Sequence, residues 1–225
     1  MGIIRMGIPK DVVTSILNMI DCNVFIETGT YRGQTSIWAS NHFKEIHTIE
    51  FSKEIHAIAK ENIKASGKKI HLYFGDSRSN LDKIYKSKSE SALLWLDAHW
   101  CSGLSYGEED QCPLIDELDV INKANHDDII LIDDARLFAA PPPLPNETKY
   151  YPDLAETVGK LLEIDRYIAI FEDVIFAVPT KHKKFFQDLL QEYTTQEWHK
   201  TKASSFREKI VNSKGDLKRL IKNWI

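Results

Sequence analysis

The sequence predicts an α/β protein, a three-layer sandwich in which a mostly parallel sheet lies between two layers of helices. Short runs of strand-forming residues alternate with segments of helical periodicity along most of the 225-residue chain, and such alternation implies βαβ units with right-handed crossovers. Glycines and acidic residues follow several of the strand-like runs. Two further apolar runs, 167–171 and 174–178, are joined by a turn so tight that the strands must be antiparallel.

Each element is predicted from a local pattern. An opening helix is expected over 9–20, where apolar residues recur at spacings of three and four. The proline run at 139–145 can form neither a helix nor a central strand, so it predicts a stiff loop; a docking site for a proline-binding partner is the alternative. Strands are expected at 24–27, 45–50, 70–74, 92–96 and 129–132. Further helices are expected from about 52, from about 78, over 113–121 and over 153–164.

The turn after the first strand carries the spacing E-x-G-x-x-x-G, formed by Glu27, Gly29 and Gly33. Glycine permits an otherwise strained turn and lets a ligand approach the backbone closely. A dinucleotide-binding turn has glycine where this chain has Glu27, and a carboxylate there would repel a pyrophosphate but attract a cationic ligand. Strand–glycine–helix turns also occur in many α/β proteins, and a nicotinamide oxidoreductase is disfavoured because the third glycine is missing.

Two acids follow the next strands. Glu50 lies 23 residues after Glu27, close to the offset of roughly 20 residues at which an acid meets ribose hydroxyls in nucleotide folds. Alternatively, Glu50 caps the helix that follows. Asp76 follows the third strand, where it can contact a nucleobase, cap the next helix, or do both.

At these positions the chain resembles the class I S-adenosylmethionine-dependent methyltransferases over about residues 24–179. The resemblance implies a Rossmann-like methyltransferase fold, with a seven-stranded sheet in which one strand is antiparallel. It also implies S-adenosyl-L-methionine as cofactor. The residues expected to bind it are Glu27, Gly29, Thr30, Gly33, Thr35, Ser36, Glu50, Phe51, Asp76, Ser77 and Asp97.

Three carboxylates and an imidazole follow the fourth and fifth strands, as Asp97, His99, Asp133 and Asp134. Adjacent strands lie about 4.8 Å apart, and carboxylates brought so close need a cation or a proton to neutralise them. Mg²⁺, a hard ion that prefers oxygen ligands, is one solution. Ion pairing with Arg136, helix capping, and a half-buried structural histidine are the alternatives.

The same segment resembles the metal-dependent sugar O-methyltransferases, although its local surroundings differ from theirs. The resemblance makes Asp97, Asp133 and Asp134 the metal ligands, with His99 and Asp97 as catalytic residues and His99 as the general base. Arg136 and Tyr106 are assigned to the acceptor.

The predicted activity is therefore O-methylation of a sugar, a sugar nucleotide or a similar polyhydroxylated small molecule, with metal assistance. A macromolecular acceptor is one alternative. A non-catalytic binding or interaction module is the other.

The net charge, the cysteines and the terminal segments lead to predictions about partners, cellular location and domain organisation. The net charge of −4 argues against nucleic acid as partner. Three cysteines without C-x-x-C spacing, and the lack of a leader or a long apolar run, predict a cytoplasmic protein without membrane insertion. We expect a methyltransferase domain over 1–180 and a helical extension over 181–225, with helices near 181–193 and 216–224. The apolar stripe of the extension predicts packing on the domain or on a second subunit of a homodimer.

Overall fold

The computed structural model describes residues 7–88, 90–99 and 110–199. Within them the strands form one seven-stranded sheet in the order β3-β2-β1-β4-β5-β7-β6. This confirms the predicted fold class. The strands are β1 Val24–Thr28, β2 Glu45–Glu50, β3 His71–Phe74, β4 Ala92–Leu96, β5 Ile129–Ile132, β6 Arg166–Phe171 and β7 Val174–Pro179.

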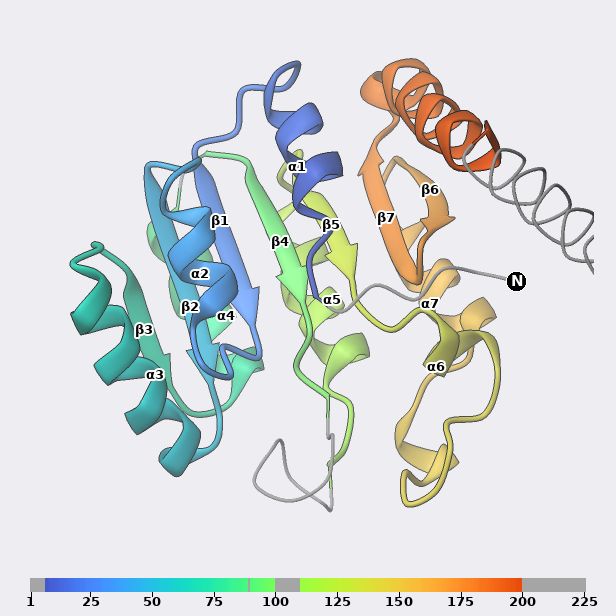
Figure 1. Ribbon diagram of the computed structural model, residues 1–225. Coiled ribbons are helices and arrows are strands. Elements are labelled where there is room, and N and C mark those ends of the chain that lie inside the picture. The colour runs from blue at the N-terminus through green and yellow to red at the C-terminus, as the bar shows by residue number, and fades with distance from the viewer. Residues whose placement is uncertain (1–6, 89, 100–109, 200–225) are drawn as a thin grey trace, which may run out of the picture. The chain divides into compact units, whose positions relative to one another are not determined.

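The helices connect and cover this sheet. Figure 1 shows α1, α2 and α3 on one face of the sheet, with α4, α5 and α7 behind it. The helices are α1 Lys10–Leu17, α2 Gln34–Ala39, α3 Lys53–Ser66, α4 Ser77–Ser87, α5 Leu114–Ala124, α6 Arg136–Ala139 and α7 Leu154–Leu161, with 3₁₀ turns η1 Thr148–Tyr150 and η2 Thr180–His182.

Strands β1 to β5 pair in parallel, whereas β7 runs antiparallel to both β5 and β6. The chain moves outward from β1 to β3 and then returns to place β4 on the other side of β1. The boundary between β1 and β4 is therefore the topological switch point, where open α/β sheets bind ligands beyond the carboxyl ends of the strands.

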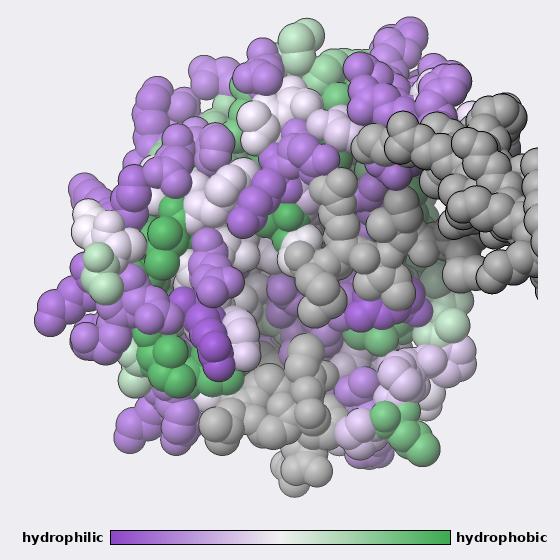
Figure 2. Space-filling model, viewed as in Figure 1, coloured by the Kyte–Doolittle hydropathy of each residue, from purple (hydrophilic) through white to green (hydrophobic). Residues whose placement is uncertain are grey.

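The core explains why these segments become strands. Every residue of β1, β4 and β5 is buried, as expected for parallel strands covered on both faces. One layer of this core joins Ile26 and Leu94 of the sheet to Leu81 of α4, Leu118 of α5 and Leu161 of α7. On the face shown in Figure 2, the surface of the described residues is largely hydrophilic, with separate hydrophobic areas.

Side-chain caps fix the starts of three helices. Ser52 Oγ accepts a hydrogen bond from Ile55 N at the start of α3, and Asp76 accepts one from Ser79 N at the start of α4. Asp153 accepts one from Glu156 N at the start of α7. The capping role predicted for Asp76 is confirmed, whereas the cap of α3 is Ser52 and not Glu50.

Some helices begin or end at residues other than those predicted. Helices α1 and α7 are shorter than expected, and α5 runs on to Ala124, where Asn125 adopts a left-handed conformation and ends it. One helical turn, α6, precedes the segment predicted as a loop and includes its first residue, Ala139. The proline run that follows is neither helix nor strand over 141–143.

The chain divides into two compact units, Met1–Lys183 and Lys184–Ile225. In the second unit the described residues, 184–199, are helical, and the predicted helix near 216–224 lies outside them. No helix in the described part of the chain has the length and apolarity needed to cross a bilayer.

Candidate active site

The turn between β1 and α2 is built on two glycines with positive φ. Gly29 has φ +84°, and a Cβ added there would lie 2.3 Å from the backbone oxygen of Asp97. Gly33 has φ +78° and precedes the first residue of α2. Only glycine lets the backbone of this turn press against the end of β4, so the predicted glycine positions have a steric cause.

Glu27 lies under this turn and is 1% exposed. Its Oε2 accepts hydrogen bonds from Ser36 Oγ at 2.5 Å and from Thr48 Oγ1 at 2.7 Å. Thr48 Oγ1 also lies 2.6 Å from Thr30 Oγ1. Burial raises the pKa of Glu27 to about 7, while hydrogen bonds from Ser36, Thr48 and Thr35 oppose the rise. These hydroxyls allow a buried carboxylate to form near neutral pH.

Thr48 is a residue that sequence reasoning missed. Its signal was a small hydroxyl side chain, next to His47, in the buried stretch between Ile46 and Ile49. The pairing of β1 with β2 places Thr48 opposite Glu27, and that register is not readable from the sequence.

Glu50 holds the turn from the other side. Its Oε2 accepts from the backbone N–H of Tyr31, and its Oε1 from that of Ser52, both at 2.9 Å. Burial raises the pKa of Glu50, against the backbone hydrogen bonds that lower it. Phe51, the next residue, is 41% exposed. Glu50 thus ties the turn to the start of α3, and its contact with a ribose stays a prediction.

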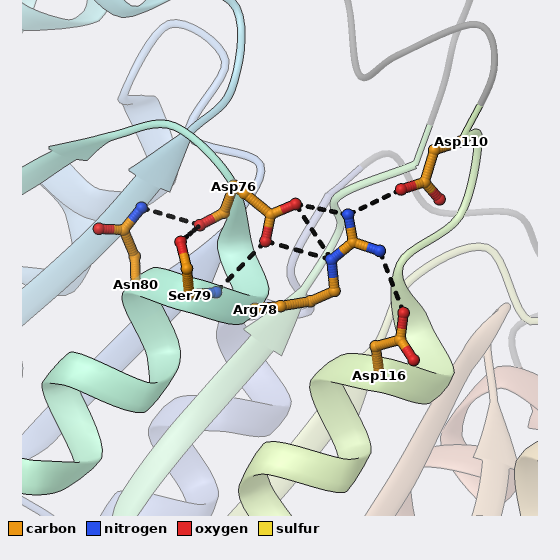
Figure 3. Close-up of polar contacts among 6 residues, drawn as sticks. All are labelled: Asp76, Arg78, Ser79, Asn80, Asp110 and Asp116. Atoms are coloured by element: carbon orange, nitrogen blue, oxygen red, sulfur yellow. Dashed lines mark hydrogen bonds and ion pairs between the residues drawn. The ribbon is translucent and has the colours of Figure 1, made fainter.

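Asp76 is held by Arg78, as Figure 3 shows. Its Oδ1 accepts from Ser79 N and Arg78 Nε, and its Oδ2 accepts from Arg78 Nε and Nη2. The same guanidinium binds Asp110 and Asp116. A carboxylate oxygen offers two lone-pair directions, so these contacts engage most of the acceptor capacity of Asp76. Arg78 was not among the predicted site residues.

The residues after β4 and β5 form a second group, the polar cluster of Asp97, His99, Asp133, Asp134 and Arg136. His99 Nε2 lies 2.9 Å from Asp134 Oδ2, and His99 Nδ1 lies 3.6 Å from Asp97 Oδ1. Arg136 Nη1 lies 2.7 Å from Asp134 Oδ1. Asp133 Oδ1 accepts from the backbone N–H of Asp134 at 2.8 Å. The structure thus brings the predicted catalytic residues together.

Charge in the polar cluster is unevenly distributed. Burial and then the neighbouring Asp133 raise the pKa of Asp97 well above its usual value. Burial and Asp134 raise that of Asp133 to about 7. Burial would also raise the pKa of Asp134, but His99 and Arg136 hold it below its usual value. Asp134 is therefore the stable anion of the cluster, while Asp97 and Asp133 readily carry protons.

Asp173 completes the cluster and was also missed. It lies in the turn between β6 and β7, its backbone oxygen accepts from Ala135 N, and its carboxylate accepts from Arg136 N and binds the Arg136 guanidinium. Arg136 therefore bridges Asp134 and Asp173. The ion-pair alternative for this region is confirmed at Arg136.

The predicted metal ligands are close in space, but no three His, Cys, Asp or Glu side chains in the described segments form a group that could hold a metal ion. Both oxygens of Asp134 are already engaged, Oδ2 by His99 Nε2 and Oδ1 by the Arg136 guanidinium. Tyr106, predicted to contact the acceptor, lies outside the described residues.

The sequence matches no protein-family model and no curated protein. The fold is similar to that of solved methyltransferase structures. An O-methyltransferase from Streptomyces achromogenes involved in tomaymycin synthesis, in complex with SAM, has TM-score 0.55 and 14% identity over 78% of this chain and 82% of that one. An O-methyltransferase from Bacillus cereus in complex with SAH has TM-score 0.55 and 14% identity, covering 77% and 82%.

An SAH-bound methyltransferase from Podospora anserina has TM-score 0.55 and 19% identity, covering 77% of this chain and 79% of that one. At these identities the likeness shows a shared fold. It agrees with the Rossmann-like methyltransferase fold that the sequence predicted.

Proposed function

We propose that this chain is an S-adenosylmethionine-dependent O-methyltransferase that methylates a hydroxyl of a sugar, a sugar nucleotide or a similar polyhydroxylated small molecule. One observation carries the proposal. The close packing of Gly29 against the Asp97 backbone brings the glycine turn next to the start of the polar cluster, at the switch point of the sheet.

The glycine turn fits the donor. The carboxylates of Glu27 and Glu50 lie under and beside it, and negative charge there favours a cationic sulfonium nucleoside over a pyrophosphate. SAM or SAH is bound in the solved O-methyltransferases of this fold described above. S-adenosylmethionine, when bound, supplies a methyl group on positively charged sulfur for in-line attack by an oxygen.

His99 is the proposed general base. With Nε2–H donating to Asp134, the imidazole presents Nδ1 as its basic nitrogen, on the side that faces Asp97. An acceptor hydroxyl that donates to Nδ1 would lose its proton there, and Asp134 would stabilise the resulting imidazolium. Holding the acceptor in register beside the donor supplies most of the remaining rate.

The polar cluster as described does not fit a metal ion, because the Asp134 carboxylate already pairs with His99 and Arg136. The proposed proton transfer therefore proceeds through side chains alone. Assistance by Mg²⁺ at Asp97, Asp133 and Asp134 stays a prediction. Arg136 is likewise committed to two carboxylates, which weakens the idea that it binds an anionic group of the acceptor.

The test is a transfer assay with methyl-labelled donor against a panel of sugars, sugar nucleotides and glycans, alongside donor calorimetry. We expect donor binding and transfer to a hydroxyl compound. Replacing His99→Gln should lower kcat by about 10²–10⁴-fold while leaving donor affinity within about twofold. Donor binding without transfer to any acceptor would favour an interaction module, and transfer only to protein or nucleic acid would favour a macromolecular acceptor. The absence of donor binding would reject the proposal.

A further inference from the structure

Two loops lead away from the polar cluster, one after β4 and one after β5. Of these loops the structure describes residues 110–113 and 137–151. The two segments are in contact, because the buried Gln111 accepts through its Oε1 a hydrogen bond from the backbone N–H of Glu147 at 2.8 Å. We call the polar cluster and these two loop segments the acceptor side, since the proposed acceptor would lie beside His99.

The acceptor side contains one arginine and one lysine, Arg136 and Lys149, and both are paired with carboxylates. The Arg136 guanidinium bridges Asp134 and Asp173. Lys149 Nζ lies 2.8 Å from Glu147 Oε2. The lysine pair is exposed and therefore weak, but its two charges cancel. An anionic group of a ligand would have to compete with a carboxylate for either cation.

Negative charge remains on the acceptor side after this pairing. Asp134 and Asp173 share one guanidinium, so one carboxylate charge is left over even when the other two aspartates of the polar cluster carry protons. Their side chains are 17% and 7% exposed, and salt screens such partly buried charges less than surface charges. The sequence of residues 100–109 adds two glutamates and no lysine or arginine. The acceptor side therefore attracts a cation and repels an anion.

We propose that Asp173 is a specificity-determining residue, which restricts the protein to acceptors without phosphate and favours those that carry an amino group. The inference rests on the proposed function and narrows its substrate class. Phosphate is recognised by lysine or, in a bidentate manner, by arginine. By binding Arg136, Asp173 keeps the guanidinium nearest the polar cluster from serving that purpose. A protonated amine would instead lie against the carboxylate charge that is left over.

The experiment compares matched acceptors in the methyl-transfer assay, on the full chain at pH 7. Each sugar of the panel is supplied as a neutral glycoside, as an amino sugar, as a sugar phosphate and linked to a nucleoside diphosphate. We expect kcat/KM for the neutral and amino forms to exceed that for the phosphorylated forms by at least about tenfold, because like charges are repelled. The advantage of the amino form over the neutral form should shrink between about 50 mM and about 500 mM salt.

Asp173→Asn tests the residue itself. Asparagine tolerates the positive φ of this position, +69°, and the change leaves Arg136 with Asp134 as its carboxylate partner in the polar cluster. The ratio of kcat/KM for the phosphorylated form to that for the neutral form should rise about tenfold, whatever the common change in kcat. Adding Arg136→Met should return the ratio to the wild-type value. If Asp173→Asn does not fold, Asp173→Gly also suits a positive φ and gives the same test.

Three variants serve as controls for the ratio. Asp165→Asn makes the same chemical change at the other end of the β6–β7 hairpin, where Asp165 accepts from Thr180. Lys149→Met removes the other cation of the acceptor side. Arg32→Met removes an arginine of the glycine turn, whose guanidinium carbon lies 5.3 Å from the centre of the Tyr31 ring. All three should keep the wild-type ratio.

The outcomes distinguish this inference from the proposed function. A wild type that uses a phosphorylated form as well as the neutral form, or better, would overturn the inference and leave the proposed function in place. An unchanged ratio in Asp173→Asn, or an equal change in any of the three controls, would overturn the role of Asp173. An amino form that is no better than the neutral form at low salt would overturn the preference for an amine. Transfer to none of the forms would reject the proposed function itself.

Discussion

At the scale of single residues, two kinds of constraint shape the glycine turn. Gly29 is constrained by space, because any side chain would meet the backbone of Asp97. Glu27 is constrained by solvation, because its carboxylate is buried and depends on neighbouring hydroxyls. Each constraint predicts a different response to substitution.

Gly29→Ala should abolish donor binding and lower the free energy of unfolding by more than about 2 kcal/mol, because the new methyl group clashes with backbone and φ is positive. Denaturant unfolding and donor calorimetry measure both effects. The control is Gly159→Ala in α7, where a Cβ meets nothing within 4 Å and helix propensity predicts a gain of up to about 1 kcal/mol. Wild-type donor affinity in Gly29→Ala would contradict the proposed role of the turn.

Glu27 should make stability depend on pH. Its folded-state pKa of about 7 lies above the ordinary glutamate value of 4.5, so the folded state holds a proton that the unfolded state releases. This contribution to stability is lost as pH rises from about 5 to 8. Between pH 5 and pH 8 the free energy of unfolding of the wild type should therefore fall by about 1–3 kcal/mol more than that of Glu27→Gln.

The matched control for this experiment is Glu61→Gln on the exposed face of α3, which should leave the pH dependence unchanged. Identical slopes for the wild type and Glu27→Gln would show that Glu27 titrates normally.

At the scale of elements, the β6–β7 turn supports the polar cluster from a distant part of the sequence. Glu172 and Asp173 both have positive φ, as does Asp134. Such conformations are strained for residues other than glycine, and they often accompany functional sites. Through Asp173 the turn fixes Ala135 and Arg136, and through Arg136 it orients Asp134.

Asp173→Asn should keep the left-handed backbone, which asparagine tolerates, but lose the charge that holds Arg136. We expect kcat to fall about tenfold with donor affinity unchanged, because Asp134 would be less well oriented toward His99. Asp165→Asn at the other end of the hairpin, where Asp165 accepts from Thr180, should leave kcat unchanged. Equal effects of the two variants would indicate a general loss of hairpin stability.

At the scale of the whole molecule, the sheet places two functional groups side by side through its strand order. Most of the residues predicted to bind the donor follow β1 to β3, and the polar cluster comes from the ends of β4 and β5 and from the β6–β7 turn. The extension beyond residue 180 stays a proposal as a separate helical part of the protein.

Chelation tests how the polar cluster is neutralised. Because Arg136 already neutralises Asp134 and His99 lies within hydrogen-bond distance of it, we expect turnover to persist in excess chelator. Arg136→Met should lower turnover by leaving Asp134 without its guanidinium partner. Activity that disappears with chelator and returns with Mg²⁺ would instead support the metal-assisted interpretation.

The sequence by itself determined the layers of the fold, the positions of the strands and the glycine turn, because these follow from periodicity and from the conformational limits of single residues. It also placed His99 and the acids at adjacent strand ends. What Asp76, Asp134 and Arg136 bind was decided only by the tertiary structure. Thr48, Arg78 and Asp173 were added to the candidate site there as well, because such contacts depend on strand register and on which turns meet, and neither is encoded locally.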